Sequence, residues 1–301
     1  MAGQTRREFL GRSAAVMVAA GTMLDVRAMM ASPFGLPLGL QLYSVRELLP
    51  TDYEGTLKQV AALGYREVEA AGFYKHPVDE VKQDMKAAGL RCVSGHYPSA
   101  ELHARMDEIL AFHTSLEAEY IICSSPGHKD QAAQAGGGHG APLTIDDWRW
   151  NADEFNMFGK KVKAAGLRFG YHNHVAEFQP VDGAVPYDDL LTLTDPALVT
   201  MEMDCGWVKV GGGDPVAYLR KYPTRISMLH VKDFKPKDAS AGADDRPKAA
   251  ELGQGTMDYR VIFAAANKGQ IKHCFVEQEA FNMAPMESLK VDAEYMKRLT
   301  V

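Results

Sequence analysis

The chain has 301 residues, of which 46% are hydrophobic and 24% are charged, the balance of a globular protein rather than a disordered or fibrous one. Its formal net charge is −6, and the sequence contains no cluster of lysine and arginine with interleaved aromatic residues. Nucleic acid is therefore excluded as the expected partner, because binding it requires a basic surface.

The first 31 residues have the pattern of an export signal. Arg6 and Arg7 precede a Phe-Leu pair, and the apolar run that follows, residues 14–23, is too short to cross a bilayer. The paired arginines resemble the twin-arginine signal, although Gly11 stands where a lysine is often found. We expect residues 1–31 to be removed and the mature protein to be periplasmic or otherwise exported, without a stable membrane anchor.

From residue 34 onward, short apolar runs alternate with amphipathic stretches. The expected strands are residues 38–45, 65–71, 90–97, 118–126, 167–174, 198–208, 226–234 and 271–280. The expected helices are residues 52–63, 77–88, 99–117, 144–165, 186–194, 214–221, 257–268 and 284–298. Eight strand–helix units predict a single (β/α)8 TIM barrel over residues 34–301. An open doubly wound sheet is the alternative, but the Gly-rich phosphate turn after its first strand is missing.

Two polar stretches interrupt this alternation. Residues 127–143 and 235–255 follow the fourth and seventh strands, so both are expected at the C-terminal face of the barrel, the first as a mobile loop or lid. His128 and His139 in the first stretch are interpreted as solvated loop histidines rather than catalytic groups.

The four cysteines do not form an evident disulfide framework. Cys92, Cys123, Cys205 and Cys274 each lie in or beside a different apolar run, which predicts buried free thiols. An oxidising compartment would permit disulfides, and spacing alone leaves one cross-strand pair open.

Polar side chains follow nearly every predicted strand, at the barrel end where catalytic groups project. These residues are Gln41, Tyr43, Glu69, His96, Ser124, Ser125, His172, His174, Glu177, Glu202, Asp204, His230, Lys232, Glu277 and Glu279. Because side chains alternate along a strand, Glu202 shares a face with Asp204, and His230 shares one with Lys232. Carboxylates and imidazoles that converge in this way predict a site for Mn²⁺, Mg²⁺, Co²⁺ or Zn²⁺ rather than for a thiolate-preferring ion.

Seven motifs carry a resemblance to a known family. They are QLYSVR, GYREVEAAGFY, YHNHVAEF, MEMDCGWVKVGGGDP, LHVKDF, ELGQGTMDY and FVEQE. Over residues 39–298 the chain resembles the xylose isomerase-like (sugar phosphate isomerase/epimerase) family. The resemblance implies one divalent metal, with Mn²⁺ preferred, held by Asp204, His230 and Glu277 with Glu177 as fourth ligand. Gly170 stands where many relatives have a glutamate, which keeps His172 or His174 open as the fourth ligand.

The resemblance also implies proton abstraction beside a carbonyl through a metal-stabilised enediolate. Glu177 and Glu277 are the expected catalytic pair on opposite faces of the substrate. The residues expected to bind substrate are Tyr43, Glu69, His96, His172, His174, Trp207, Lys232 and Gln254. The last of these departs from the glutamate that relatives often have.

We therefore expect a metal-dependent isomerase or epimerase acting on a small sugar or keto-sugar. Phosphate is not expected on the substrate, because the segments after strands seven and eight lack a Gly-rich anion loop. A lyase or dehydratase acting on a 3-keto-glycoside or related keto-sugar is the alternative, and a non-catalytic carbohydrate-binding barrel is the second. DNA cleavage conflicts with the acidic balance. Assembly into a homo-oligomer stays open.

Overall fold

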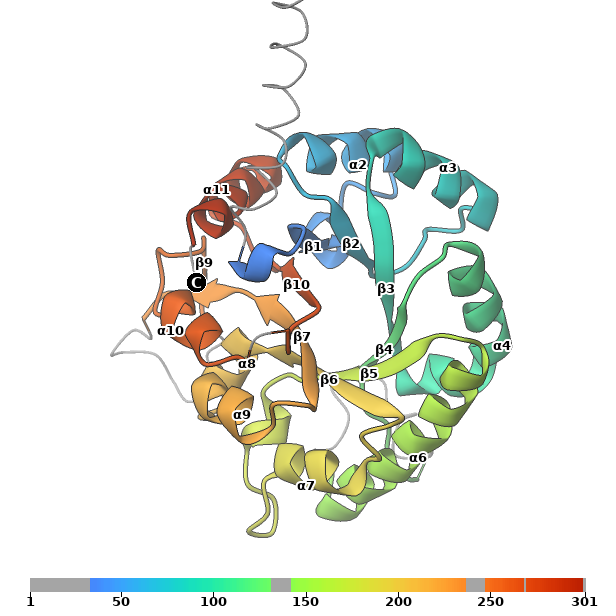
Figure 1. Cartoon of the computed structure of the whole chain (residues 1–301), viewed down its shortest axis with the longest axis vertical. Coiled ribbons are helices and arrows are strands. Elements are labelled where there is room, and N and C mark those ends of the chain that lie inside the picture. Colours follow the sequence, from blue (N-terminus) through green and yellow to red (C-terminus); the bar gives the residue numbers. More distant parts are fainter. Residues whose placement is uncertain (1–32, 131–141, 237–246, 268, 300–301) are drawn as a thin grey trace, which may run out of the picture.

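Eight parallel strands close into a barrel surrounded by helices in the computed structural model, which describes residues 33–130, 142–236, 247–267 and 269–299 (Figure 1). The strand order β1-β10-β7-β6-β5-β4-β3-β2 places the first strand beside the last. This closure confirms the predicted (β/α)8 barrel and excludes the open sheet. The predicted export signal, residues 1–31, lies outside the described residues, as does His139.

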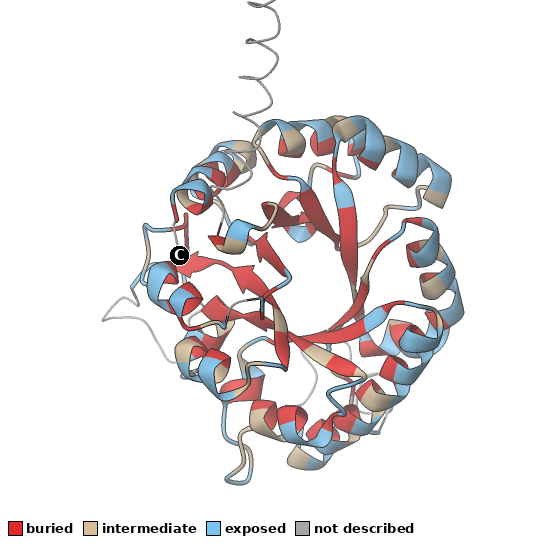
Figure 2. Ribbon diagram, in the orientation of Figure 1, coloured by how far each residue is buried: buried red, intermediate tan, exposed pale blue. Residues whose placement is uncertain are grey.

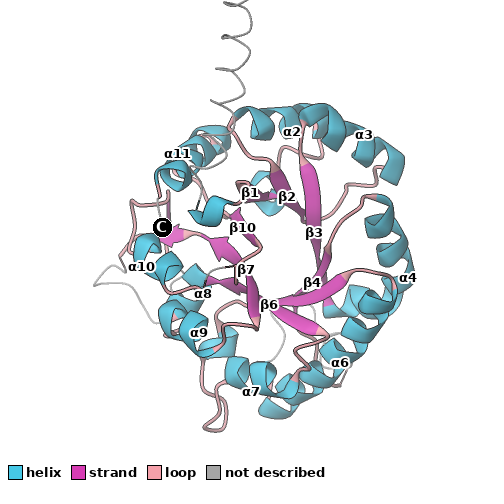
Figure 3. Ribbon diagram, viewed as in Figure 1, coloured by secondary structure: helices cyan, strands magenta, loops and turns pink. Residues whose placement is uncertain are grey.

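The strands occupy the centre and the helices the periphery (Figure 3). The barrel strands are β1 (Gly39–Gln41), β2 (Glu67–Ala70), β3 (Arg91–Pro98), β4 (Tyr120–Ser125), β5 (Arg168–His172), β6 (Val199–Asp204), β7 (Ile226–Val231) and β10 (His273–Val276). The α-helices are α2 (Tyr53–Ala62), α3 (Val78–Ala88), α4 (Ser99–Ser115), α6 (Ile145–Ala164), α7 (Pro186–Leu193), α8 (Cys205–Val210), α9 (Pro215–Lys221), α10 (Tyr259–Ala264) and α11 (Pro285–Arg298). The shorter elements are the 3-10 helices η1 (Pro33–Gly35), η2 (Leu42–Val45) and η3 (Ala176–Phe178), and the antiparallel pair β8 (Asp233–Phe234) and β9 (Ala249–Ala250). Among the described residues, no helix is both long enough and apolar enough to span a membrane.

Local signals fix the helix ends that the sequence predicts. Asp214 caps α9 by accepting a hydrogen bond from the Val216 amide at 2.9 Å, and Pro215 occupies the first helical position. Gly89 ends α3 in the left-handed conformation, with φ of 72°. All eight predicted helices are present, with boundaries shifted by a few residues.

Most predicted strands extend beyond the observed ones, and in the first and the sixth the extra residues form a helix instead. The first ends at Gln41, whose side chain accepts from the Tyr43 amide at 3.0 Å and begins η2. The sixth ends at Asp204, whose Oδ1 accepts from the Trp207 amide at 2.8 Å and caps α8, a helix the sequence did not predict. In both cases a side-chain cap turns an apolar run away from the sheet.

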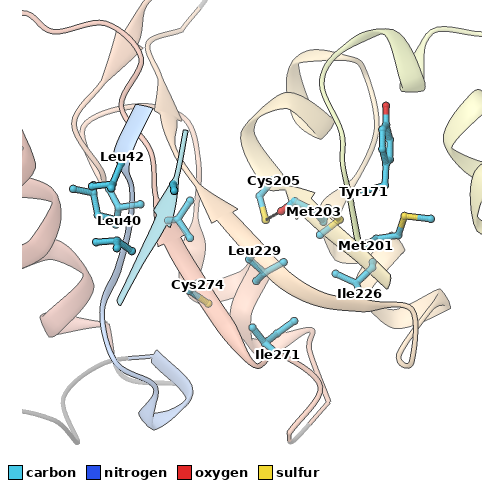
Figure 4. Close-up of a cluster of buried hydrophobic side chains, with 14 of the residues drawn as sticks. Leu40, Leu42, Tyr171, Met201, Met203, Cys205, Ile226, Leu229, Ile271 and Cys274 are labelled. Atoms are coloured by element: carbon cyan, nitrogen blue, oxygen red, sulfur yellow. Dashed lines mark hydrogen bonds between the residues drawn. The ribbon is translucent and has the colours of Figure 1, made fainter. Parts of the chain in front are cut away.

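Side chains along each strand alternate between the helices and the barrel interior. Met201, Met203 and Cys205 point outward from the β6 segment into the layer beneath the helices (Figure 4). The strands are buried almost throughout, while the helices expose one side (Figure 2). All four cysteines are buried and free, which confirms the prediction of free thiols.

The barrel interior is stacked in three layers. At the N-terminal ends of the strands, Glu67 accepts from Arg91 and lies 2.7 Å from Nδ1 of His273. An apolar layer lies above this pair and consists of Val93, Tyr120, Ile122, Met228 and Phe275. Gly170 belongs here because a Cβ at that position would lie 2.8 Å from Cδ1 of Ile122. Carboxylates and imidazoles form the third layer, at the C-terminal ends of the strands.

We predict that His113 makes the fold sensitive to acid. This α4 residue is fully buried, its Nε2 lies 2.8 Å from the Tyr97 hydroxyl, and burial lowers its pKa to about 4. Because the unfolded chain binds this proton more tightly, the stability is complete above pH 6.5 and is lost as the pH falls towards 4. At pH 5 the loss amounts to about 2 kcal/mol.

The measurement is the free energy of unfolding in urea at pH 7.5 and pH 5, for the wild type and for His113→Gln. The wild type should lose about 2 kcal/mol more than the variant between the two pH values. An equal loss in both proteins would show that His113 is not the responsible group.

Candidate active site

A cavity of about 1200 Å³ opens at the C-terminal ends of the barrel strands. Most of the predicted site residues meet there. Those that line the cavity are Tyr43, His96, His172, His174, Trp207 and Glu277. Glu69, Asp204, His230 and Lys232 are buried in the layer of carboxylates and imidazoles at the same end of the barrel. The location agrees with the rule that barrel active sites occupy this face.

One group of side chains has the character of a metal centre. His172, Asp204, His230 and Glu277 each offer a nitrogen or oxygen, and these atoms all lie within 4.8 Å of one another. They come from β5, β6, β7 and the residue after β10, so four neighbouring strands supply one donor each. All four side chains are buried. Such a mixed set suits a divalent cation of intermediate hardness.

Asp204 fits this interpretation at the level of single atoms. Its Oδ1 caps α8, which directs Oδ2 toward the group. Oδ2 is buried and makes no hydrogen bond of normal geometry with the described residues, although the Lys232 ammonium lies 2.8 Å away. Burial raises the pKa of Asp204 to about 6, and Lys232 and His230 oppose that rise. A cation beside Oδ2 would remove the cost of burying this acceptor.

Lys232 supplies the fixed positive charge of the site. Its Nζ contacts Asp204 at 2.8 Å, Glu277 at 2.7 Å and Glu279. Burial lowers the pKa of Lys232, but the three carboxylates outweigh burial and raise the pKa above its ordinary value. For the acid Glu277, burial acts in the opposite direction and raises the pKa. The positive charges of Lys232 and His230 outweigh this effect and hold the pKa of Glu277 well below its ordinary value. Lys232 and Glu277 are therefore both charged at neutral pH.

Glu177, the residue predicted as fourth ligand, lies outside this group. The chain leaves β5 and turns into η3, which folds Glu177 back toward Tyr171 on the outer side of the barrel. Its Oε1 accepts from the Tyr171 hydroxyl at 2.6 Å and from the His174 amide at 2.8 Å. The structure thus brings His172, the alternative that the sequence left open, together with Asp204, His230 and Glu277.

A second group lies beside the first and includes Glu202, a strand-end residue to which the sequence analysis assigned no role. His96, His172, His230 and Glu202 offer donor atoms within 4.8 Å of one another. Glu69 also belongs to this region, because its Oε1 lies 2.7 Å from Nε2 of His230 and 2.8 Å from Nε2 of His96. Glu202 shares the inward face of β6 with Asp204, as the alternation along the strand predicted, although no role as a ligand or a substrate-binding residue was predicted for it.

Aromatic side chains form the walls of the cavity. Tyr43 is 42% exposed, and the Arg46 guanidinium packs over its ring, with Cζ of Arg46 4.2 Å from the centre of the Tyr43 ring. Trp207 packs on Phe234, and its indole nitrogen donates to Glu279 at 3.1 Å. Both predicted aromatic residues therefore lie in the wall of the cavity, where they are available to pack on a bound ligand.

Gln254 is not brought to the cavity. It is exposed in a turn whose backbone is held by the buried carboxylate of Asp233, and the cavity is lined instead by Thr256 and Met257. Asp233 accepts from the backbone amides of Phe234, Gly253, Gly255, Thr256 and Met257 at 2.8–3.1 Å. This arrangement fixes one wall of the cavity to the strand segment that carries Lys232.

Comparison with known proteins agrees with the barrel fold. Residues 57–299 match the family described as Xylose isomerase-like TIM barrel. Inosose dehydratase of Clostridium perfringens (strain 13 / Type A) is 23% identical over 274 residues, covering 82% of this chain and 90% of the relative. A sugar phosphate isomerase/epimerase from Parabacteroides distasonis ATCC 8503 is 28% identical with a TM-score of 0.71, covering 86% of this chain and 96% of that one. The IOLI protein with a bound zinc atom shares the fold at 11% identity and a TM-score of 0.66, covering 87% and 98%.

We predict that His172, rather than Glu177, completes the metal centre. Asp204→Asn and His172→Ala should each weaken Mn²⁺ or Zn²⁺ binding at least about tenfold, because each removes a donor from the group. Glu177→Gln should leave the affinity nearly unchanged, since its partners are Tyr171 and a backbone amide. Isothermal titration of the metal-free protein measures these affinities, and thermal unfolding confirms that each variant is folded. Loss of binding in Glu177→Gln with retention in His172→Ala would restore Glu177 as the ligand.

Proposed function

Because the chain belongs to the xylose isomerase-like TIM barrel family, we propose that it is a divalent-metal-dependent lyase that removes water or an aglycone from a keto-sugar or a cyclic keto-polyol. Two of the relatives named above, the inosose dehydratase and the sugar phosphate isomerase/epimerase, are named as enzymes that act on sugars or sugar-like compounds. Three features support the proposal. They are the buried donor group, the single carboxylate of that group that reaches the cavity, and the similarity to inosose dehydratase.

The donor group supports a resident metal ion, and we assign its ligands as His172, Asp204, His230 and Glu277. A divalent ion bound there would act as a Lewis acid and stabilise the negative charge that develops on the substrate's carbonyl oxygen. Mn²⁺ is the proposed ion, with Mg²⁺, Co²⁺ and Zn²⁺ as alternatives. The IOLI protein, which shares this fold, has a bound zinc atom, and this supports the proposal of a metal in this chain.

The observation that carries the choice of a lyase is the position of the carboxylates. Epimerisation by two acids requires one carboxylate on each face of the substrate, and Glu177 and Glu277 were the expected pair. Glu277 lines the cavity, whereas Glu177 hydrogen-bonds to Tyr171 and is not part of its lining.

Two other carboxylates line the cavity, but Glu101 pairs with Arg105 at the rim, and Glu279 pairs with Lys232 and accepts from Trp207. One carboxylate is sufficient to remove a proton next to a carbonyl. Elimination then needs only a proton donor for the departing group.

The side chains around the cavity have distinct proposed tasks. Glu277 accepts the proton from the carbon beside the carbonyl, and Lys232 keeps Glu277 ionised through their 2.7 Å contact. His96 lines the same cavity and is the proposed proton donor to the leaving group. Tyr43 and Trp207 pack on the apolar faces of the ring. We further propose that the substrate carries no phosphate, consistent with the proposed export of the chain.

An epimerase is the second candidate, because the Parabacteroides distasonis isomerase/epimerase is also similar over nearly the whole chain. The two functions differ in product. A lyase yields an unsaturated ketone that has lost water or an aglycone, whereas an epimerase returns a deuteron to the same carbon in D₂O. A binding protein is disfavoured, since holding a sugar does not require several buried carboxylates.

We predict metal-dependent elimination that depends on Glu277. The protein, depleted with EDTA and reloaded with Mn²⁺, is incubated in D₂O with an inosose, a 3-keto-glucoside and a ketohexose, and the products are followed by NMR. Glu277→Gln at saturating Mn²⁺ should lower the rate by about 10²–10⁴-fold. Glu101→Gln is the matched control, because Glu101 also lines the cavity but pairs with Arg105 at its rim. Deuterated epimer without elimination would establish the epimerase, and no turnover of any compound would reject both activities for these substrates.

A further inference from the structure

We propose that Glu69 and Glu202 are positioning residues that determine which ring nitrogen of His172 and His230 faces the metal centre. This inference rests on the metal centre of the proposed function and extends it to two carboxylates that are not themselves among the proposed ligands. Glu69 lies on β2 and Glu202 on β6, so they reach the interior from opposite sides of the barrel (Figure 1). Both side chains are completely buried.

The imidazole rings of His172 and His230 lie between the proposed metal centre and the carboxylate pair Glu69 and Glu202. Nδ1 of His230 is 3.0 Å from Glu277 Oε2, while its Nε2 is 2.7 Å from Glu69 Oε1 and 3.3 Å from Glu202 Oε2. Nε2 of His172 is 3.9 Å from Asp204 Oδ2, while its Nδ1 is 3.2 Å from Glu202 Oε2. Each ring therefore presents one nitrogen to the proposed ligands and the other to the pair.

Nδ1 of His230 also faces a carboxylate, that of Glu277, so it is a cation among the proposed ligands that would leave each ring a single tautomer. A neutral imidazole carries one N–H, and an ionised carboxylate only accepts hydrogen bonds. The nitrogen that faces the pair must then carry the proton, which is Nε2 of His230 and Nδ1 of His172. The opposite nitrogens, Nδ1 of His230 and Nε2 of His172, retain the lone pairs that a metal ligand needs. A carboxylate behind a ligating histidine orients the ring and increases its basicity.

The carboxylates are themselves held in place. Glu69 accepts from Gln41 Nε2 at 2.8 Å and from Ser94 Oγ at 2.5 Å. His96 Nε2 lies between the pair, 2.8 Å from Glu69 Oε1 and 2.7 Å from Glu202 Oε2. Residues of β1 and β3 thus orient the two carboxylates. These contacts do not involve the ring nitrogens of His172 and His230 that face the proposed metal.

A second metal ion among His96, His172, Glu202 and His230 is the competing explanation, since their donor atoms also lie within 4.8 Å. The ring positions favour the positioning role. His172 and His230 present opposite nitrogens to the two groups, so occupation of both sites would require both rings to lose their last proton. A neutral imidazole can ligate on one side only.

The test begins with the wild type and needs no substitution. Histidine-¹⁵N-labelled protein loaded with diamagnetic Zn²⁺ reports the protonated nitrogen of each ring by two-dimensional ¹⁵N–¹H NMR. The expected result is one Zn²⁺ per chain, with the proton on Nε2 of His230 and on Nδ1 of His172. The opposite tautomers, two Zn²⁺ per chain, or no zinc binding would each overturn the proposal.

Two variants then measure the effect on affinity. Glu202→Gln and Glu69→Gln should each weaken Zn²⁺ binding about 10–100-fold and alter the histidine signals, because an amide can also donate and so permits the other tautomer. Glu67→Gln is the matched control, a buried glutamate on β2 that hydrogen-bonds to His273 at the opposite end of the barrel. Unchanged affinity and unchanged tautomers in folded Glu202→Gln would contradict the positioning role. A wild type with the expected tautomers but no turnover would reject the proposed lyase and leave this inference standing.

Discussion

Four carboxylates buried at one end of the barrel impose the constraint on which the rest of the site depends. Glu69, Glu202, Asp204 and Glu277 each have less than a tenth of their surface exposed, and Lys232 is the one lysine or arginine of the described residues that contacts any of them. Buried charges without partners are costly, so the region requires further positive charge or protons. Three imidazoles meet part of that requirement, and the proposed divalent cation would meet the rest.

Much of the fold and of the candidate site could be predicted from the sequence, because the patterns that indicate them involve residues close together in the chain. Alternation along a strand requires only neighbouring residues, so Asp204 could be placed on the inner face and Met203 on the outer one. The eight-unit alternation then predicts closure into a barrel, and closure brings the strand ends together. Asp204, His230 and Glu277 converge as the sequence indicated because each lies on a strand or directly after one.

The remaining details depend on contacts between distant segments. Beyond the end of a strand, alternation no longer determines which way a side chain points. Glu177 points toward Tyr171 because η3 and a hydrogen bond of 2.6 Å hold it there. The partners of Glu202 come from β3, β5 and β7, so no local pattern reveals that it faces three imidazoles. Gln254 lies away from the cavity because Asp233 folds its loop. Helix α8 was not predicted because the apolar run continues past Asp204 and was assigned to the strand. Asp204 ends the strand by capping α8 with one carboxylate oxygen, and the other oxygen belongs to the donor group.

The apolar layer beneath the site has a consequence for molecular traffic. Val93, Tyr120, Ile122, Met228 and Phe275 pack the centre of the barrel and leave the cavity closed from below. Among the described residues, the cavity that Tyr43 and Trp207 line lies on the other side of this layer. If the proposed elimination takes place there, substrate would enter and both products would leave by that same face of the barrel. A small leaving molecule formed next to the layer would then have to pass the larger ring to reach solvent, so the release of the ring would control how soon the site is free again.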